Sequence, residues 1–177
     1  MLKTILMATL LAIGSHSYAS DPETTTLIFV NAAEVEGSPS ADPNLSTNGQ
    51  EQAAQLAASL DGTEIAAIYT TFMNRAVQTV TPLAKARQQK LDYFRFTGDP
   101  DLTSRSVKDM ITRNAGKTIV ICSDPENIVA MLREAGVKGK DLKTLYDKGC
   151  GQVLVVKHSG GSQVLAQKLN MNIQKKV

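Results

Sequence analysis

Three short, strongly apolar segments limit what this chain can fold into. Residues 27–30 read Leu-Ile-Phe-Val, residues 65–69 read Ile-Ala-Ala-Ile-Tyr, and residues 118–122 read Thr-Ile-Val-Ile-Cys. Short apolar runs of this kind, without alternating polar positions, are typical of strands that are buried on both faces. Each run is followed by a stretch with apolar residues at helical spacing. The alternation predicts an α/β fold, a three-layer sandwich around a mostly parallel central sheet.

The stretches between these runs predict the other elements. After a polar loop at residues 37–44, Ser46 or Thr47 is expected to cap a helix, and Thr47 to Gln50 has the spacing of a capping box. Further elements are expected as helices over residues 74–89, 107–116 and 128–132 and as a short strand over residues 93–96. At the C-terminus, residues 152–157 and 163–169 flank a Ser-Gly-Gly turn. This pattern predicts an antiparallel hairpin.

The first 19 residues have the layout of a secretory signal peptide. A positive charge precedes an apolar run at residues 5–13, and the small residues Ser17 and Ala19 then form a Ser-x-Ala cleavage pattern. The apolar run is too short to span a bilayer, and no later segment is apolar for longer. We therefore expect a signal peptide over residues 1–19 and a single mature domain over residues 20–177, in a periplasm or outside the cell.

The charge balance narrows the class of partner. The chain has a formal charge of +2, and residues 1–19 contain one Lys and no acid, so the mature domain carries +1. A nearly neutral domain is not typical of proteins that bind nucleic acid or an anionic membrane. With two Cys and a single His in the mature chain, the composition does not favour a zinc site. No metal or cofactor is expected.

Three segments of the mature chain resemble motifs of one enzyme family. Residues 45–53, Leu-Ser-Thr-Asn-Gly-Gln-Glu-Gln-Ala, are similar to a helix start of the form Leu-Thr-x-x-Gly-x-x-Gln-Ala. Residues 69–79, Tyr-Thr-Thr-Phe-Met-Asn-Arg-Ala-Val-Gln-Thr, are similar to Tyr-Ser-Ser-x-x-x-Arg-x-x-Gln-Thr. Residues 31–34, Asn-Ala-Ala-Glu, follow the first strand where that family has Arg-His-Ala-Glu or Arg-His-Gly. These motifs are those of the histidine phosphatase superfamily, the phosphoglycerate-mutase-like enzymes.

The resemblance covers residues 26–169, and in size the chain resembles the small phosphohistidine phosphatase branch. It implies a phosphoglycerate-mutase-like fold. It also implies a site in which two His and two Arg surround one phosphate. One His attacks the phosphoryl group, and the other three residues neutralise the charge that develops on its oxygens.

The same resemblance implies that this site is degenerate. Asn31 stands in the place of the first Arg, Ala32 in that of the nucleophilic His, and Asp124 in that of the second His. Only Arg75 is retained. His158 falls in the C-terminal hairpin and cannot substitute, and the other His of the chain belongs to the signal peptide. No histidine is then available to be phosphorylated.

A pocket that holds one Arg and one carboxylate is close to neutral, whereas the enzyme pocket is strongly cationic. Asp124 facing a phosphate dianion would repel it, and Arg75 alone offers a single bidentate grip. We hypothesise that Arg75 and Asp124 form an ion pair across the former pocket. The alternative is that both face solvent independently, because ion pairs in exposed clefts contribute little.

Two further residues near the first strand have alternative interpretations. Glu34 could contact a ligand, or it could be a solvated loop acid. Asn31 could donate a hydrogen bond to an anion at the carboxyl edge of the sheet, or it could close the turn between strand and loop. The candidate ligand-binding residues are therefore Arg75, Asn31, Glu34 and Asp124.

Three hypotheses of function follow from the degenerate site. The preferred one is an exported, catalytically inactive family member that binds a small anionic ligand or a protein. The second is a phosphatase with an atypical nucleophile, Asp124 or Cys122. It is disfavoured because the thiol has no His partner and because aspartyl-phosphate chemistry needs a metal and a carboxylate cluster. The third is a structural accessory protein that kept the fold and lost the pocket.

The two cysteines give the first testable prediction. In an oxidising compartment a pair is more often a disulfide than two free thiols, so Cys122 and Cys150 are expected to be bonded. In the chain-entropy model this crosslink stabilises the fold by about 3 to 4 kcal/mol. Mass spectrometry of the exported protein, with and without reduction, measures the bond. Two alkylatable thiols in the unreduced protein would refute it.

Overall fold

The computed structural model describes residues 24–37, 39–145, 149, 151–159 and 164–169. Residues 1–19, expected to be a signal peptide, lie outside these ranges. Within the described residues the chain forms, in order, β1 (Thr25–Asn31), α1 (Thr47–Ser59), β2 (Ala67–Thr70), α2 (Asn74–Arg87), β3 (Leu91–Tyr93), α3 (Pro100–Arg113), β4 (Thr118–Ser123), α4 (Pro125–Glu134), α5 (Gly139–Leu145), β5 (Val153–His158) and β6 (Val164–Leu169).

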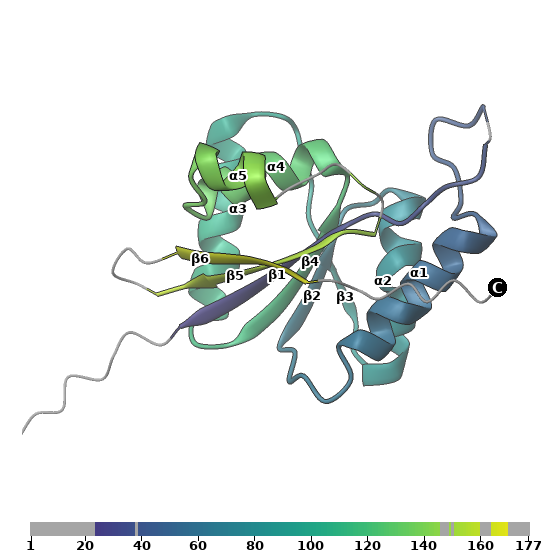
Figure 1. The fold of residues 1–177 in the computed structure, drawn as a ribbon, viewed down its shortest axis with the longest axis horizontal. Coiled ribbons are helices and arrows are strands. Elements are labelled where there is room, and N and C mark those ends of the chain that lie inside the picture. The colour runs from purple at the N-terminus through teal and green to yellow at the C-terminus, as the bar shows by residue number, and fades with distance from the viewer. Residues whose placement is uncertain (1–23, 38, 146–148, 150, 160–163, 170–177) are drawn as a thin grey trace, which may run out of the picture.

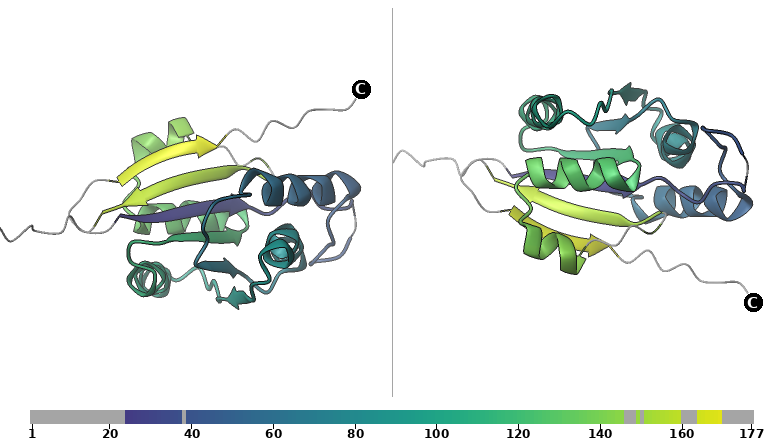
Figure 2. Two further views of the ribbon diagram at one scale, coloured as in Figure 1. Left: turned by 90° about the horizontal axis from the view of Figure 1, so that it is seen from below. Right: turned by 90° about the horizontal axis from the view of Figure 1, so that it is seen from above.

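The strands form one six-stranded sheet in the order β3-β2-β4-β1-β5-β6. The pairs β1–β4, β2–β4 and β2–β3 are parallel, and β5 runs antiparallel to β1 and to β6. Figure 2 shows β6 and β3 at opposite edges of the twisted sheet. The predicted mostly parallel sheet with a C-terminal hairpin is therefore confirmed. The two glycines of the predicted turn lie outside the described residues.

The helices cover both faces of the sheet, which gives the predicted three layers (Figure 1). Leu27 and Phe29 of β1 pack into one core with residues of α3, α4 and α5. Ile28 and Val30 pack into a second core with residues of α1 and α2. Alternate side chains of a strand point to opposite faces, so an uninterrupted apolar run supplies both cores. No helix in the described part of the chain is long and apolar enough to cross a membrane.

Three elements differ from the sequence prediction, and the first is α3, which begins at Pro100 rather than at residue 107. The strand expected at residues 93–96 lies at Leu91–Tyr93, where it pairs with β2 from Ile68 to Thr70. β2 ends at Thr70, so the ladder ends there too, and Phe94 and Phe96 instead pack as loop residues against the core next to α3 and α4. α5 was not predicted, because its short sequence, Gly-Lys-Asp-Leu-Lys-Thr-Leu, carries too few apolar residues to show a helical period.

The start of α1 is held by the loop that follows β1. Ser46 is the N-cap, and its hydroxyl accepts a hydrogen bond from the Gly49 amide at 3.0 Å. The predicted capping box from Thr47 to Gln50 is wrong, because the helix begins one residue earlier than that spacing requires. The Ser46 amide also donates to the Glu34 carbonyl at 2.9 Å. The chain after β1 and the first turn of α1 therefore pack backbone against backbone.

This close packing predicts a large effect for one glycine. A Cβ added at Gly49 would lie 1.9 Å from the Glu34 carbonyl oxygen, whereas one added at Gly37 would meet nothing within 4 Å. We expect Gly49→Ala to lower the free energy of unfolding by about 1–3 kcal/mol or more, because the backbone must move apart. Gly37→Ala is the matched control. Urea denaturation followed by circular dichroism measures both, and equal midpoints would contradict the contact.

Candidate functional site

The carboxyl ends of three neighbouring strands meet at one edge of the sheet. Asn31, the last residue of β1, lies opposite Ser123, the last residue of β4, and β2 ends beside them at Thr70. In open α/β sheets this edge is where ligands bind. The candidate residues from the sequence fall there because β1 and β4 run parallel and in register.

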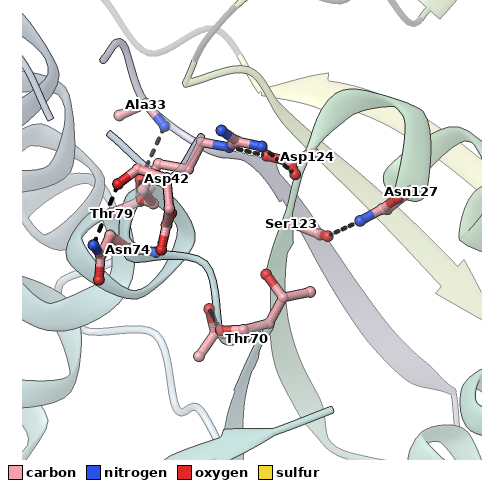
Figure 3. Close-up of polar contacts among 10 residues, drawn as sticks. Ala33, Asp42, Thr70, Asn74, Thr79, Ser123, Asp124 and Asn127 are labelled. Atoms are coloured by element: carbon pink, nitrogen blue, oxygen red, sulfur yellow. Dashed lines mark hydrogen bonds and ion pairs between the residues drawn. The ribbon is translucent and has the colours of Figure 1, made fainter. Parts of the chain in front are cut away.

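Arg75 and Asp124 form a bidentate ion pair at this edge. Arg75 lies in the first turn of α2, and Asp124 lies between β4 and α4. The Arg75 Nε donates to Asp124 Oδ1 at 2.5 Å and Nη2 donates to Oδ2 at 2.8 Å, with the two side chains 25% and 18% exposed. Figure 3 shows Asp124 at the end of β4, facing the start of α2. The hypothesised pairing is confirmed, and the alternative of two independent solvent-facing side chains is wrong.

The local structure leaves Asp124 available for this pair. It is the N-cap residue of α4, a position where Asp commonly accepts a bond from the helix, but its side chain makes no such bond. The next residue is Pro125, which has no amide hydrogen to donate. Ser123 instead accepts a hydrogen bond from Asn127 Nδ2 at 2.9 Å, within the same turn. The carboxylate of Asp124 therefore turns toward α2 rather than into its own helix.

Other carboxylates surround the ion pair. Asp42 Oδ1 accepts a hydrogen bond from the Asn74 amide at 2.8 Å and so caps the start of α2 (Figure 3). The pKa of Arg75 is raised, first by its hydrogen bonds to Asp124 and further by the charges of Asp124, Asp42 and Glu126, while partial burial opposes the shift. One guanidinium thus lies among three carboxylates. Among the described charged groups that act on Arg75, all are carboxylates, which would repel a phosphate.

Asn31 and Ala32, at the end of β1, are buried and hydrogen-bonded to other parts of the chain. The Ala32 side chain belongs to the core between the sheet and the helices α1 and α2, and its amide donates to the Ser123 carbonyl at 2.9 Å. Asn31 is also buried, and its Nδ2 donates to the Gly149 carbonyl at 2.8 Å. That contact supports the interpretation of Asn31 as a structural residue, because the amide nitrogen is turned toward the chain before β5.

Comparison with known proteins agrees with the fold and with these motifs. The model of the histidine phosphatase superfamily (branch 1) matches residues 30–174. This chain belongs to the histidine phosphatase superfamily. No curated protein sequence matches it.

Several solved structures of histidine phosphatases share the fold at low sequence identity. A phosphoserine phosphatase from Entamoeba histolytica, a histidine-to-alanine mutant in complex with phosphoserine, is 17% identical with a TM-score of 0.67, over 84% of this chain and 98% of that one. The protein histidine phosphatase SixA in complex with tungstate is 13% identical with a TM-score of 0.67, over 82% and 97%. A phosphoglycerate mutase from Bacillus anthracis is 14% identical with a TM-score of 0.63, over 85% and 95%.

Glu34 has a structural role that neither sequence interpretation included. Its carboxylate accepts hydrogen bonds from Ser46 Oγ at 2.8 Å and from Asn48 Nδ2 at 2.7 Å, next to the N-terminus of α1. These two bonds, Asn48 first, lower the pKa of Glu34, against a smaller opposing effect of desolvation. Its amide also donates to Gln52 Oε1 at 3.0 Å. Glu34 is thus a partly exposed loop acid whose side chain also ties the loop after β1 to α1.

Two residues that position this edge were not identified from the sequence. Thr79 Oγ1 accepts a hydrogen bond from the Ala33 amide at 2.9 Å and donates to the Arg75 carbonyl at 2.6 Å. Gln78 Oε1 accepts from the Leu45 amide at 2.8 Å. Both belong to the Arg-x-x-Gln-Thr motif, which served only to indicate the family. The motif in fact anchors both ends of the loop between β1 and α1 to α2.

Cys122 is unsuited to act as a nucleophile. Its side chain is fully buried in the core next to α1 and α2, and the structure carries it as a free thiol. Burial and, to a lesser degree, the charge of Asp124 raise the pKa of this thiol far above its usual range, against a smaller lowering by Thr79. Its predicted partner Cys150 lies outside the described residues, so the disulfide stays a prediction. Among the described residues, no cluster of His, Cys, Asp and Glu is arranged to hold a metal ion.

The ion pair predicts a measurable loss of stability. We expect Asp124→Asn to lower the free energy of unfolding by about 1–3 kcal/mol, because it leaves a partly buried guanidinium without its countercharge. The matched control is Asp109→Asn, which breaks the Arg113–Asp109 pair on α3, where the two side chains are 71% and 54% exposed. That control should change stability by about 0.5 kcal/mol or less.

A double-mutant cycle isolates the pair from other effects of each substitution. The double variant Arg75→Gln/Asp124→Asn should lose less free energy of unfolding than the sum of the losses in the two single variants. Denaturant unfolding of the four proteins gives the coupling energy. If the losses of unfolding free energy are strictly additive, the ion pair itself does not stabilise the fold.

Proposed function

We propose that this protein is an exported, catalytically silent histidine phosphatase homologue that acts by binding a partner. The observation that supports the proposal best is the bidentate pair of Arg75 with Asp124. The guanidinium that resembles the family's phosphate ligand is satisfied by the chain's own carboxylate. With Ala32 in the place of the nucleophile, the described residues of the site include neither a histidine to accept a phosphoryl group nor a second guanidinium to hold one.

The charges at the site favour a protein partner over a small anion. A phosphate dianion at Arg75 would have to displace Asp124 and would then meet Asp42 and Glu126, which both act electrostatically on Arg75. Like charges repel one another, so both carboxylates would oppose binding of the dianion. Of the two partner classes considered from the sequence, the site therefore opposes the small anionic ligand.

Loss of the nucleophile would not by itself abolish ligand binding. The Entamoeba phosphoserine phosphatase holds phosphoserine in a histidine-to-alanine mutant. By analogy, Ala32 alone would leave a pocket that still binds phosphate. The introduction of Asp124, which pairs with Arg75, is the change that prevents phosphate from binding in this pocket.

The remaining alternatives have less support. Cys122 is buried with a raised pKa, and both oxygens of Asp124 accept hydrogen bonds from Arg75, so neither is presented as a nucleophile. A purely structural accessory protein has less support, because Phe72 is 63% exposed at the same edge and offers an apolar contact to a partner. Export and the Cys122–Cys150 disulfide belong to the same proposal, and N-terminal sequencing of the secreted chain should begin at Ser20.

An aryl phosphate assay and a thermal shift assay test the proposal together. The mature chain should show no turnover above blank, and inorganic phosphate should not raise its melting temperature. Asp124→Ala should also be inactive, but phosphate should now stabilise it by a few degrees, since a ligand that binds only the native state raises the melting temperature. Asp109→Ala, on the distant α3, should gain no such response.

The two assays can each overturn a different part of the proposal. Turnover by the wild-type chain that is lost in Asp124→Ala or Cys122→Ser would establish an atypical phosphatase. Stabilisation of the wild type by phosphate at millimolar concentration would restore the small anion as the ligand.

A further inference from the structure

Asn48 and Gly49 form the one Asn-Gly dipeptide of the sequence, and the pair lies in the first turn of α1. Asparagine deamidates spontaneously, and it does so fastest when glycine follows, because glycine has no side chain to hinder the attacking amide. Asn48 is exposed, so water and base reach its side chain. The dipeptide is therefore a candidate site of a chemical modification that needs no enzyme.

The chemistry of this modification uses only the chain and water. The backbone nitrogen of Gly49, deprotonated by base, attacks Cγ of Asn48 and forms a new C–N bond. The bond from Cγ to Nδ2 breaks, and ammonia leaves with the proton that the backbone nitrogen lost. Water then opens the five-membered succinimide to aspartate or to isoaspartate, in which the main chain runs through Cγ and is one carbon longer. The net change is loss of ammonia, uptake of water and one new carboxylate.

Both reacting groups of the dipeptide are held by one hydrogen-bond network. The Gly49 amide, which is the attacking group, donates to Ser46 Oγ at 3.0 Å. Nδ2 of Asn48, which is the leaving group, donates to Glu34 Oε2 at 2.7 Å. Ser46 Oγ in turn donates to Glu34 Oε1 at 2.8 Å. The network therefore closes on a single carboxylate and opposes the reaction at both ends.

The helical backbone opposes the reaction as well. In a helical residue Cγ and the next backbone nitrogen are held apart, so the ring can close only after the first turn of α1 has opened. Helix ends open more readily than helix interiors. Here the Ser46 amide donates to the Glu34 carbonyl at 2.9 Å and keeps the turn closed. The rate of deamidation should therefore follow the opening of this turn.

The same contacts explain why a labile dipeptide occupies this position. A Cβ at Gly49 would lie 1.9 Å from the Glu34 carbonyl oxygen, so the close packing uses a glycine. Asn48 supplies an N–H donor to the Glu34 carboxylate, and its bond is the largest of the effects that lower the pKa of Glu34. An ionised aspartate in its place has no donor to offer. The structure thus uses each residue of the dipeptide for a contact with Glu34.

We propose that Asn48–Gly49 is a spontaneous deamidation site, that the network around Glu34 slows its reaction, and that the reaction releases the loop after β1 from α1. The new carboxylate replaces a donor to Glu34, and the two like charges repel each other. Isoaspartate also displaces Gly49 from its place against the Glu34 backbone. The reaction needs neither phosphate nor a partner, so the inference goes beyond the proposed function and does not depend on it.

Peptide mapping of the full mature chain after incubation at mildly alkaline pH measures the reaction. A glutamate-specific protease releases residues 37–51, which contain both Asn44 and Asn48, and mass spectrometry locates the gain of mass. In urea-denatured protein Asn48 should react well ahead of Asn44, because the side chain of Leu45 hinders attack there. In the native protein Asn48 should react at least about tenfold more slowly than in the denatured protein.

Matched variants test the role of the network. Ser46→Ala removes the acceptor of the Gly49 amide and should speed native deamidation about fivefold. Glu34→Gln removes one of the two acceptor oxygens and should speed it about two- to threefold. The control is Thr47→Ala, an exposed position in the same turn, which should leave the rate unchanged. In urea all four proteins should react at about the same rate, because the network is absent.

Melting temperatures test the consequence of the reaction. Asn48→Asp reproduces the aspartate product and should melt a few degrees below the wild type, although an acid in the first turn otherwise favours a helix. In a Glu34→Gln background the same substitution should lower the melting temperature much less, because no like charge remains. Asn48→Gln keeps an amide donor and removes the labile dipeptide. Its melting temperature should stay constant on incubation, while that of the wild type falls as Asn48 deamidates.

Three results would each overturn the inference. One is equal reaction of Asn48 and Asn44 in the denatured protein, which would show that the dipeptide is not a site of deamidation. Another is native deamidation of Ser46→Ala at the rate of Thr47→Ala, which would show that the network does not slow the reaction. The last is wild-type stability of Asn48→Asp, which would show that the loop is not released. These measurements involve neither turnover nor phosphate, so the proposed function is decided separately.

Discussion

The hydrogen bonding of β1 on both of its sides is the constraint on which the rest of the structure depends. β4 pairs with it in parallel and β5 in antiparallel orientation, so its backbone groups are satisfied within the sheet and both of its faces can be buried. Leu27 and Phe29 then enter one core, and Ile28 and Val30 enter the other. The loop that leaves β1 is placed as a consequence, because Ala32 bonds to β4 and Ala33 bonds to Thr79 of α2.

This framework brings Asp124 and Arg75 to the same edge, and their pairing changes what the edge can do. In an enzyme of the family, preorganised cations at such a position stabilise the charge of a phosphoryl group. Here the retained cation is neutralised within the chain, and further carboxylates surround it. The superfamily fold is kept, while the guanidinium of Arg75 is paired with a carboxylate of the same chain. Fold membership therefore does not carry the activity, and the polar groups of the site have to be considered one by one.

Much of the fold could be predicted because it is recorded in local patterns. The apolar runs identified β1, β2 and β4, and helical spacing identified α1, α2 and α4 within a few residues but only the second half of α3, which begins at Pro100. β3 was misplaced because its bounds depend on where its partner β2 ends. The hydrogen bonds of Glu34 could not be predicted, because its partners, Ser46 and Asn48, lie at the start of a helix and no spacing rule connects a loop acid to a helix start twelve or more residues away.

The amino-acid sequence alone establishes the family, the alanine at position 32, and the opposite charges of Arg75 and Asp124. Only the tertiary structure decided that these two charges meet, since 49 residues separate them and the parallel pairing of β2 with β4 brings them together. It likewise decided that Phe72 and Tyr93 stack in solvent. Local sequence sets which groups are available, whereas strand order and register set which groups of distant segments come within bonding distance.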